Sequence, residues 1–117
     1  MNITHSKKFE SDVKYYLRKK KFKKILEDVK PVLLELEAGN LVGDKMPGFN
    51  LPEGAAIYKV RIANTSANVG KSNGFRLLYY VAIEDTIYLL TIYSKKDDER
   101  IPNDEQITML VANTLEF

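Results

Sequence analysis

The chain has 117 residues, a length that suits one domain of ordinary size. Hydrophobic residues make up 44% and charged residues 29%, which is typical of a globular protein and excludes a disordered chain. There is no cysteine, so disulfides and cysteine nucleophiles are excluded and a reducing, cytoplasmic location is expected. No apolar run approaches the roughly 20 residues that cross a bilayer, and residues 1–8 are too polar for a secretion signal, so no membrane partner is expected.

The formal net charge is only +2, but the charges are unevenly distributed. Residues 1–30 carry ten basic and four acidic side chains, and residues 84–117 carry three basic and eight acidic ones. Residues 54–83 carry four basic side chains and no acidic one. This asymmetry predicts one cationic side where a polyanion could bind. For the N-terminal lysines, an ordinary solvated helix face is an equally good interpretation.

The first forty residues have helical periodicity. Apolar residues recur at helical spacing over residues 9–17, and Ser6 is placed to cap this helix. A second apolar stripe covers residues 22–36, but it contains Pro31, so either the helix bends there or a new helix begins there. Residues 39–40 (GN) are a typical helix stop. The two segments predict a basic, amphipathic helical hairpin.

After an irregular connection over residues 40–55, the periodicity becomes alternating. Short connections between the alternating segments favour an antiparallel meander. A last apolar stripe, Ile107 to Leu115 behind Asn103 or Asp104, predicts a C-terminal helix. The expected fold is α+β, one domain over residues 1–117, in which the N-terminal hairpin packs on a twisted antiparallel sheet followed by a short helix. The predicted strands are residues 56–63, 75–83 and 86–94.

Several chemistries are excluded or disfavoured by the sequence. His5 is the single histidine and falls in an N-terminus expected to fray, so no histidine acid–base pair is available. Residues 97–99 (DDE) could bind a metal ion, but a solvated acidic loop is the better interpretation. Gly70-Lys71-Ser72 resembles the end of a phosphate-binding loop, but Thr65 replaces the required glycine and a strand follows. We therefore expect no cofactor.

A group of cations in the predicted strands is the most informative feature. Lys59 and Arg61 are two residues apart and point to the same face, and Arg76 begins the next strand, so it can lie beside them. An exposed sheet face with paired charges is the alternative interpretation, although this segment supplies no acidic partner. Tyr80 shares the face of Arg76, and arginine beside an aromatic ring suits nucleic acid. Because Arg76 has no acidic partner, we expect its removal to cost the fold little.

The end of the third strand supplies two further candidates. Tyr93 and Lys95 are again two residues apart, so they share a face. Tyr93 suits a core position and a site position equally well.

Three blocks resemble the RelE/ParE superfamily of toxins, most closely its HigB-like branch. Members of that branch often read K-x-R-x-A-N, then G-K-S-G-G-x-R, then L-L-x-x-Y-x-K. The resemblance covers about residues 56–107 well, and the preceding hairpin matches in layout more than in letters. The blocks are residues 58–64 (YKVRIAN), 70–80 (GKSNGFRLLYY) and 87–95 (IYLLTIYSK).

The resemblance implies the toxin of a type II toxin–antitoxin system. Such a toxin is a metal-independent, ribosome-dependent mRNA endoribonuclease (an mRNA interferase), kept silent by a cognate antitoxin that we expect to be a helix-turn-helix protein. Some relatives have a histidine in the site that this sequence lacks, which leaves the general base unassigned. The implied catalytic residues are Lys59, Arg61, Arg76, Tyr93 and Lys95, and the implied RNA-binding residues are Lys71, Tyr80 and Lys96.

The chemistry of RNA agrees with this implication in outline. RNA carries its own nucleophile, the 2′-hydroxyl, so an enzyme has to align it, move protons and stabilise charge on the phosphate. Arg61 and Arg76 suit the charge stabilisation, and Lys59 could act as a base only if it loses its proton near neutral pH. Two other functions remain open: inhibition of DNA gyrase by binding, as in ParE-type toxins, and an inactive partner-binding module. The four cations at positions 59, 61, 76 and 95 favour the ribonuclease, because a gyrase inhibitor needs no phosphate site.

Overall fold

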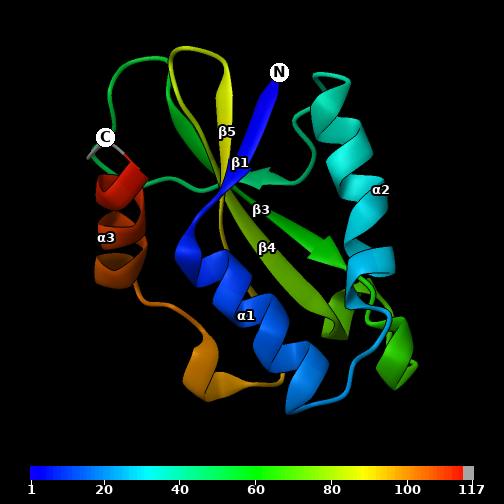
Figure 1. Ribbon diagram of the computed structural model, residues 1–117. Coiled ribbons are helices and arrows are strands. Elements are labelled where there is room, and N and C mark those ends of the chain that lie inside the picture. Colours follow the sequence, from blue (N-terminus) through cyan, green and yellow to red (C-terminus); the bar gives the residue numbers. More distant parts are fainter. Residues whose placement is uncertain (115–117) are drawn as a thin grey trace.

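The computed structural model describes residues 1–114 and has the expected α+β class, with two N-terminal helices, a five-stranded sheet and a C-terminal helix (Figure 1). Short 3-10 helices η1 (Thr65–Ala67), η2 (Lys71–Asn73) and η3 (Asp98–Arg100) lie in the connections. The main elements are β1 (Asn2–His5), α1 (Lys7–Arg18), α2 (Ile25–Glu37), β2 (Asp44–Lys45), β3 (Ala56–Ile62), β4 (Phe75–Val81), β5 (Thr86–Ser94) and α3 (Asp104–Thr114).

The sheet has the strand order β1-β5-β4-β3-β2. Its central strands β3, β4 and β5 form the predicted antiparallel meander. The sheet as a whole is mixed, because β1 pairs parallel with β5 from Asn2 opposite Thr86 to His5 opposite Leu89. The expectation of a frayed N-terminus is therefore wrong. Backbone hydrogen bonds to β5 order these residues. The sequence does not show this, because the four residues have no clear alternation of apolar and polar side chains.

The two helices of the N-terminal hairpin begin and end for identifiable reasons. Ser6 caps α1 as predicted, since its Oγ accepts a hydrogen bond of 3.0 Å from the backbone N–H of Phe9. Helix α2 continues through Pro31, so no new helix begins there, although Pro31 has no N–H to donate to the carbonyl of Glu27. Gly39 follows the end of α2 with a φ of +87°, a left-handed conformation that glycine adopts without strain.

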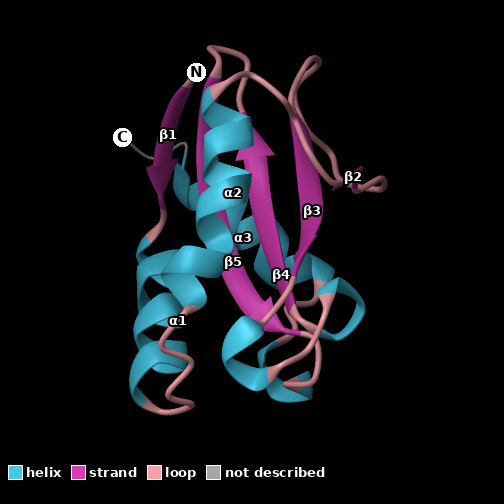
Figure 2. Ribbon diagram, turned by 90° about the vertical axis from the view of Figure 1, so that its right-hand side faces the viewer, coloured by secondary structure: helices cyan, strands magenta, loops and turns pink. Residues whose placement is uncertain are grey.

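Apolar side chains cover both faces of the sheet, as the alternation in the sequence predicts. One face packs against α1 and α2 and carries Val60, Leu77 and Tyr79. The other face, with Ile57, Leu78 and Tyr80, packs against α3 and the 46–55 segment. In Figure 2 the strands of the sheet spread across the view, with α2 in front of the sheet and α3 behind it. From the predicted C-terminal stripe, Ile107 and Val111 are buried, whereas Leu115 lies outside the described residues.

No helix within residues 1–114 is long and apolar enough to span a membrane. The longest, α2, has 13 residues.

Four buried phenols make the stability of the fold sensitive to alkaline pH. Burial raises the pKa of Tyr16, Tyr79, Tyr80 and Tyr93 above the value of about 10 for an exposed tyrosine. The native state therefore holds these protons more tightly than the unfolded chain, and the resulting stabilisation is complete below about pH 10 and is lost above it. We expect the free energy of unfolding, measured by urea titration, to fall between about pH 9 and about pH 11.

Lysines also lose protons in this pH range, so the variant Tyr93→Phe tests whether the phenols contribute to the loss of stability. Its unfolding free energy should fall less steeply with pH than that of the wild type. Identical slopes for the two proteins would contradict this assignment.

Candidate cationic site

Arg61, Arg76 and Tyr93 form one row across three strands. In the sheet register Arg61 is opposite Arg76 on β3 and β4, and Arg76 is opposite Tyr93 on β4 and β5. Lys59 lies two residues before Arg61 and therefore shares its face. The backbone N–H of Lys95 donates to the Gly74 carbonyl (2.9 Å), which extends the ladder by one residue and places Lys95 on the face of Tyr93. The five predicted catalytic residues thus lie together on the α3 side of the sheet.

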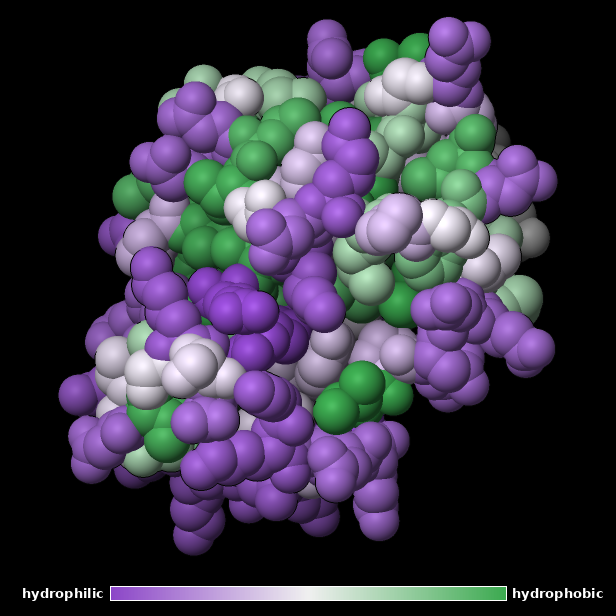
Figure 3. Space-filling view, turned by 180° about the vertical axis from the view of Figure 1, so that it is seen from behind, coloured by the Kyte–Doolittle hydropathy of each residue, from purple (hydrophilic) through white to green (hydrophobic). Residues whose placement is uncertain are grey.

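We call these five residues the cationic row, and they differ in exposure. Arg61 and Lys95 are exposed and Lys59 is half-buried, whereas Arg76 is 6% exposed and Tyr93 is 7% exposed. A ligand on this face would therefore contact Arg61, Lys59 and Lys95 first. Figure 3 views the molecule from the side opposite α1, and hydrophilic side chains gather over its lower half below an apolar region.

Arg76 has a structural role that the sequence does not indicate. Its guanidinium donates hydrogen bonds to the carbonyls of Lys71 (3.0 Å) and Ser72 (2.9 Å), both in η2. Burial, and secondarily the charge of Arg61, lower the pKa of Arg76 from its ordinary value. The expectation that Arg76 can be removed at little cost to the fold is therefore wrong, because its hydrogen bonds fix the loop that leads into β4.

Replacing Arg76 by alanine should lower the free energy of unfolding by about 1–3 kcal/mol, since a charged donor to several backbone carbonyls is lost from a buried position. Chemical denaturation of the purified variant measures this change. The control is Arg61→Ala, whose exposed side chain should cost no more than about 0.5 kcal/mol. Equal stability of the two variants would show that the loop does not depend on Arg76.

Tyr93 is both a core residue and a member of the cationic row. It packs in the cluster that contains Ile107 and Val111 of α3. Burial raises the pKa of Tyr93, and the neighbouring Arg76 lowers it in part. The phenol therefore keeps its proton at neutral pH and can act as a hydrogen-bond or proton donor, not as a base.

The predicted RNA-binding residues are not all on the surface. Lys71, in η2, and Lys96, just after β5, are exposed as a contact with RNA requires. Tyr80 is 1% exposed and its ring stacks on Tyr88 with a centroid distance of 6.2 Å. The prediction that Tyr80 stacks on an RNA base is therefore wrong. The helix α3 and the 46–55 segment cover this part of the face, and Tyr80 belongs to the core.

The second block of the resemblance contains a glycine, Gly74, whose role is steric. A Cβ added to Gly74 would lie 2.1 Å from the carbonyl oxygen of Ile62, a distance that no side chain tolerates. The close approach brings the start of β4 against the end of β3, which sets Arg76 opposite Arg61.

Asp44 is a residue near the site that sequence reasoning missed. It is the cross-strand partner of Lys59, because β2 pairs antiparallel with β3. Directly opposite residues share a face, so this carboxylate lies beside the cationic row. Across residues 1–114, no salt bridge of 4.0 Å or less joins the two side chains. A two-residue strand inside an irregular, glycine-rich connection leaves no periodic signal that could have identified Asp44.

Helix α1 holds the end of β5, from which Tyr93 and Lys95 project. The hydroxyl oxygen of Tyr16 accepts a hydrogen bond of 2.8 Å from the Ser94 N–H. The carboxylate of Asp12, which is fully buried, accepts hydrogen bonds from the Ile92 N–H (3.1 Å) and from the hydroxyl of Thr91. Asp12 also pairs with Lys8 and with Arg100 (2.8 Å). Polar residues inside an amphipathic stripe are easily taken for surface positions, which is why the sequence did not single out Asp12.

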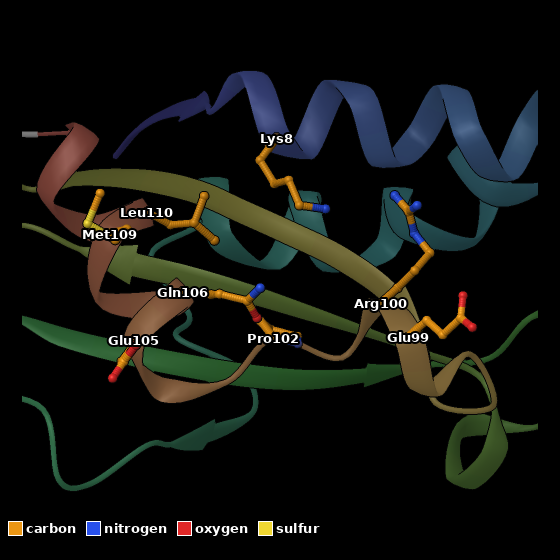
Figure 4. A pocket seen from close by; sticks show the side chains of 8 residues that line it. All are labelled: Lys8, Glu99, Arg100, Pro102, Glu105, Gln106, Met109 and Leu110. Atoms are coloured by element: carbon orange, nitrogen blue, oxygen red, sulfur yellow. The ribbon is translucent and has the colours of Figure 1, made fainter.

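Of two hollows in the structure, one is separate from the site and the other borders it. A cavity of about 410 Å³ lies between α1, η3 and α3, and Figure 4 shows Lys8, Arg100 and Leu110 at its walls. No member of the cationic row lines it, so it is separate from the candidate site. A second hollow, of about 470 Å³, lies between β3 and α2 and has Arg61 and Lys71 in its lining.

Within residues 1–114, no group of three histidine, cysteine or acidic side chains is placed to hold a metal ion. Comparison of the chain with models of known protein families gives no match, and comparison with curated proteins gives none either.

Proposed function

We propose that this chain is a toxin of a type II toxin–antitoxin system, similar to the HigB-like branch of the RelE/ParE superfamily, and that it cleaves messenger RNA on the ribosome in the cytoplasm. The observation that carries the proposal is the cationic row. The three sequence blocks that resemble the family supply its members, and the register places Arg61, Arg76 and Tyr93 side by side on adjacent strands. The α+β order of elements is compatible with the fold that the resemblance implies.

The reaction that suits this row is transesterification within the RNA strand. The 2′-oxygen attacks the adjacent phosphorus and loses its proton, while the bond from phosphorus to the 5′-oxygen breaks and that oxygen gains a proton. Arg61, which is exposed, binds two phosphate oxygens through its planar guanidinium. Arg76, beside Arg61 on the adjacent strand, adds a fixed positive charge that stabilises the charge developing on the phosphate.

Proton transfer is assigned from charge state and position. Tyr93 keeps its proton, so it donates to the departing 5′-oxygen. Lys59 on the same face is positioned to orient the 2′-hydroxyl by donating a hydrogen bond to it, and the carboxylate of Asp44, opposite Lys59, is positioned to receive the hydroxyl proton. Because side-chain cations supply the positive charge, the proposed reaction needs no metal ion.

Dependence on the ribosome follows from the poor match of these groups to neutral pH. Side chains that are weak acids and bases near pH 7 contribute modestly to proton transfer. Alignment of the 2′-oxygen, the phosphorus and the 5′-oxygen must then supply more of the rate, and a ribosome that holds the message in a bent conformation would provide it.

An antitoxin partner is part of the proposal, since an active enzyme of this kind would destroy the messages of its own cell. Arg61 and Lys95, the exposed members of the cationic row, offer cationic surface to a partner protein with acidic segments, and the exposed side chains of Leu26 and Leu34 on α2 offer apolar surface to its apolar segments. Growth arrest on expression of this chain should be reversed by co-expression of a helix-turn-helix protein encoded beside it. Harmless expression of the chain alone would argue against the toxin assignment.

The cleavage assay compares a translating extract with the same RNA free of ribosomes, both in the presence of EDTA-treated protein. We expect cuts phased with codons on translated message and none on free RNA. Intact message together with blocked supercoiling by DNA gyrase would replace the ribonuclease proposal with the gyrase inhibitor.

A further inference from the structure

The connection between α1 and α2 is the most cationic segment of the chain. Six of the seven residues at positions 18–24 (RKKKFKK) are lysine or arginine, and all six are exposed. Among the described residues, none of the six has a carboxylate oxygen within 4.0 Å. We call this segment the basic turn. Clustered like charges without counter-ions repel one another, so the arrangement suits an anionic ligand.

The basic turn is held in a fixed shape. Its single apolar residue, Phe22, points inward and stacks on Tyr16 (ring centroids 6.0 Å apart, interplanar angle 9°) and edge-on against Phe75 (6.0 Å, 71°). The backbone N–H of Lys24 donates to the hydroxyl oxygen of Ser66 (2.9 Å), which ties the turn to η1. Lys21 has a φ of +57°, a strained conformation that a solvated lysine run would not need. The backbone of the turn therefore has little conformational entropy left to lose on binding.

The position of the basic turn extends the cationic surface of the candidate site. A hollow of about 240 Å³ separates the turn from the end of β5, with Lys20 on one side and Lys96 on the other, and Asp97 also lines it. Figure 1 shows the turn, the 64–74 loop and the end of β5 together at the lower end of the molecule. Long hydrophilic side chains project from the same end in Figure 3. The anchor residue Phe75 immediately precedes Arg76 of the cationic row.

We propose that the basic turn is a second, non-catalytic binding site for the phosphate backbone of RNA. It binds backbone outside the scissile position, so it contributes affinity and orientation without taking part in the chemistry. The choice of RNA rests on the proposed function, whereas the existence of a polyanion site at the turn does not. A membrane surface is disfavoured, because Phe22, the single apolar residue of the turn, packs against Tyr16 and Phe75 instead of projecting outward to insert between lipids.

The salt dependence of RNA binding tests the proposal. Each phosphate contact contributes about 0.7 to the slope of log K against log salt for single strands and about 0.9 for duplexes. We expect the triple variant Lys19→Gln, Lys20→Gln, Lys23→Gln to lose a slope of about 2 and to bind at least about tenfold more weakly at low salt. The matched control changes Lys7, Lys14 and Lys30 to glutamine, which removes the same charge from other exposed positions.

The binding partners are a short single-stranded RNA, an RNA hairpin, message-free ribosomes, and vesicles containing phosphatidylserine. If the turn variant binds more weakly only to ribosomes and to the hairpin, the ligand is structured RNA. If it binds more weakly to every RNA, the ligand is the phosphate backbone of single-stranded and structured RNA alike. Equal loss in the turn variant and the control reduces the effect to net charge and overturns the proposal. Loss of vesicle binding with unchanged RNA binding also overturns it.

The cleavage assay tests the proposed function and the binding assay tests the basic turn, so each proposal can fail without the other. If the wild-type protein cleaves no message but the turn variant still loses RNA affinity, the proposed function falls and the basic turn stands. If the wild type cleaves and the turn variant binds RNA as tightly as the wild type, the basic turn falls alone.

Discussion

Replacing Arg61 by alanine should reduce message cleavage by about 100- to 1,000-fold while leaving the fold intact. Arg61 is the exposed arginine of the cationic row, so it is the guanidinium that can reach a phosphate directly. Loss of one preorganised donor to a developing oxyanion costs about 2.7–4 kcal/mol of transition-state stabilisation. The free energy of unfolding should change by no more than about 0.5 kcal/mol, because an exposed cation opposite Arg76 contributes repulsion and few contacts.

The measurement is the rate of message cleavage in a translating extract, with growth arrest at matched expression as the cellular counterpart. Arg61→Lys keeps the charge but loses the two-pronged geometry, so its activity should fall between the wild type and Arg61→Ala. Lys7→Ala, on a remote exposed position, is the control for charge alone and should cleave as the wild type. Full activity of Arg61→Ala would remove the cationic row from the mechanism.

Much of the fold could be predicted from the sequence because its elements have strong local signals. Alternating residues defined β3, β4 and β5, and the capping hydroxyl of Ser6 defined the start of α1. The strands β1 and β2 could not be predicted, because their partners are distant in sequence and their lengths are four and two residues. Such short strands gain their stability from an existing sheet edge, and no periodicity within them reports it.

The sequence predicted which residues share the face of the candidate site, but not which of them are buried. Period-two alternation placed Lys59 and Arg61 on one face, and the antiparallel connection placed Arg76 opposite Arg61. Alternation does not say which part of a face another element covers. Helix α3 and the 46–55 segment cover Tyr80 entirely, and the η2 carbonyls enclose Arg76. Burial of these two side chains is a tertiary property, and it separates the residues that a ligand can touch from those that shape the site.

The same distinction explains how α1 serves the site without contacting a ligand. Its buried Asp12 and Tyr16 hold the last residues of β5, and Arg100 of η3 joins Asp12 while its guanidinium stacks on Tyr15 at 3.8 Å from the ring centroid. The end of β5 is therefore bound on one side by the ladder with β4 and on the other by α1. Rigid support of this kind keeps side chains such as Tyr93 in a productive position.

Replacing Asp12 by alanine should be the most destabilising single change in this network, lowering the free energy of unfolding by about 3–5 kcal/mol. The variant leaves Arg100 without its carboxylate and leaves the Ile92 N–H without an acceptor in a buried position. The matched control is Lys8→Ala, which removes the more exposed ion-pair partner of Asp12 and should cost about 1 kcal/mol or less. Urea titration measures both variants, and Asp12→Asn, which keeps the size and one acceptor oxygen, should lie between them. If Asp12→Ala unfolds within about 1 kcal/mol of the wild type, then α1 does not hold β5 through this carboxylate, and the positioning of Tyr93 must come from the β4 ladder and the α3 packing alone.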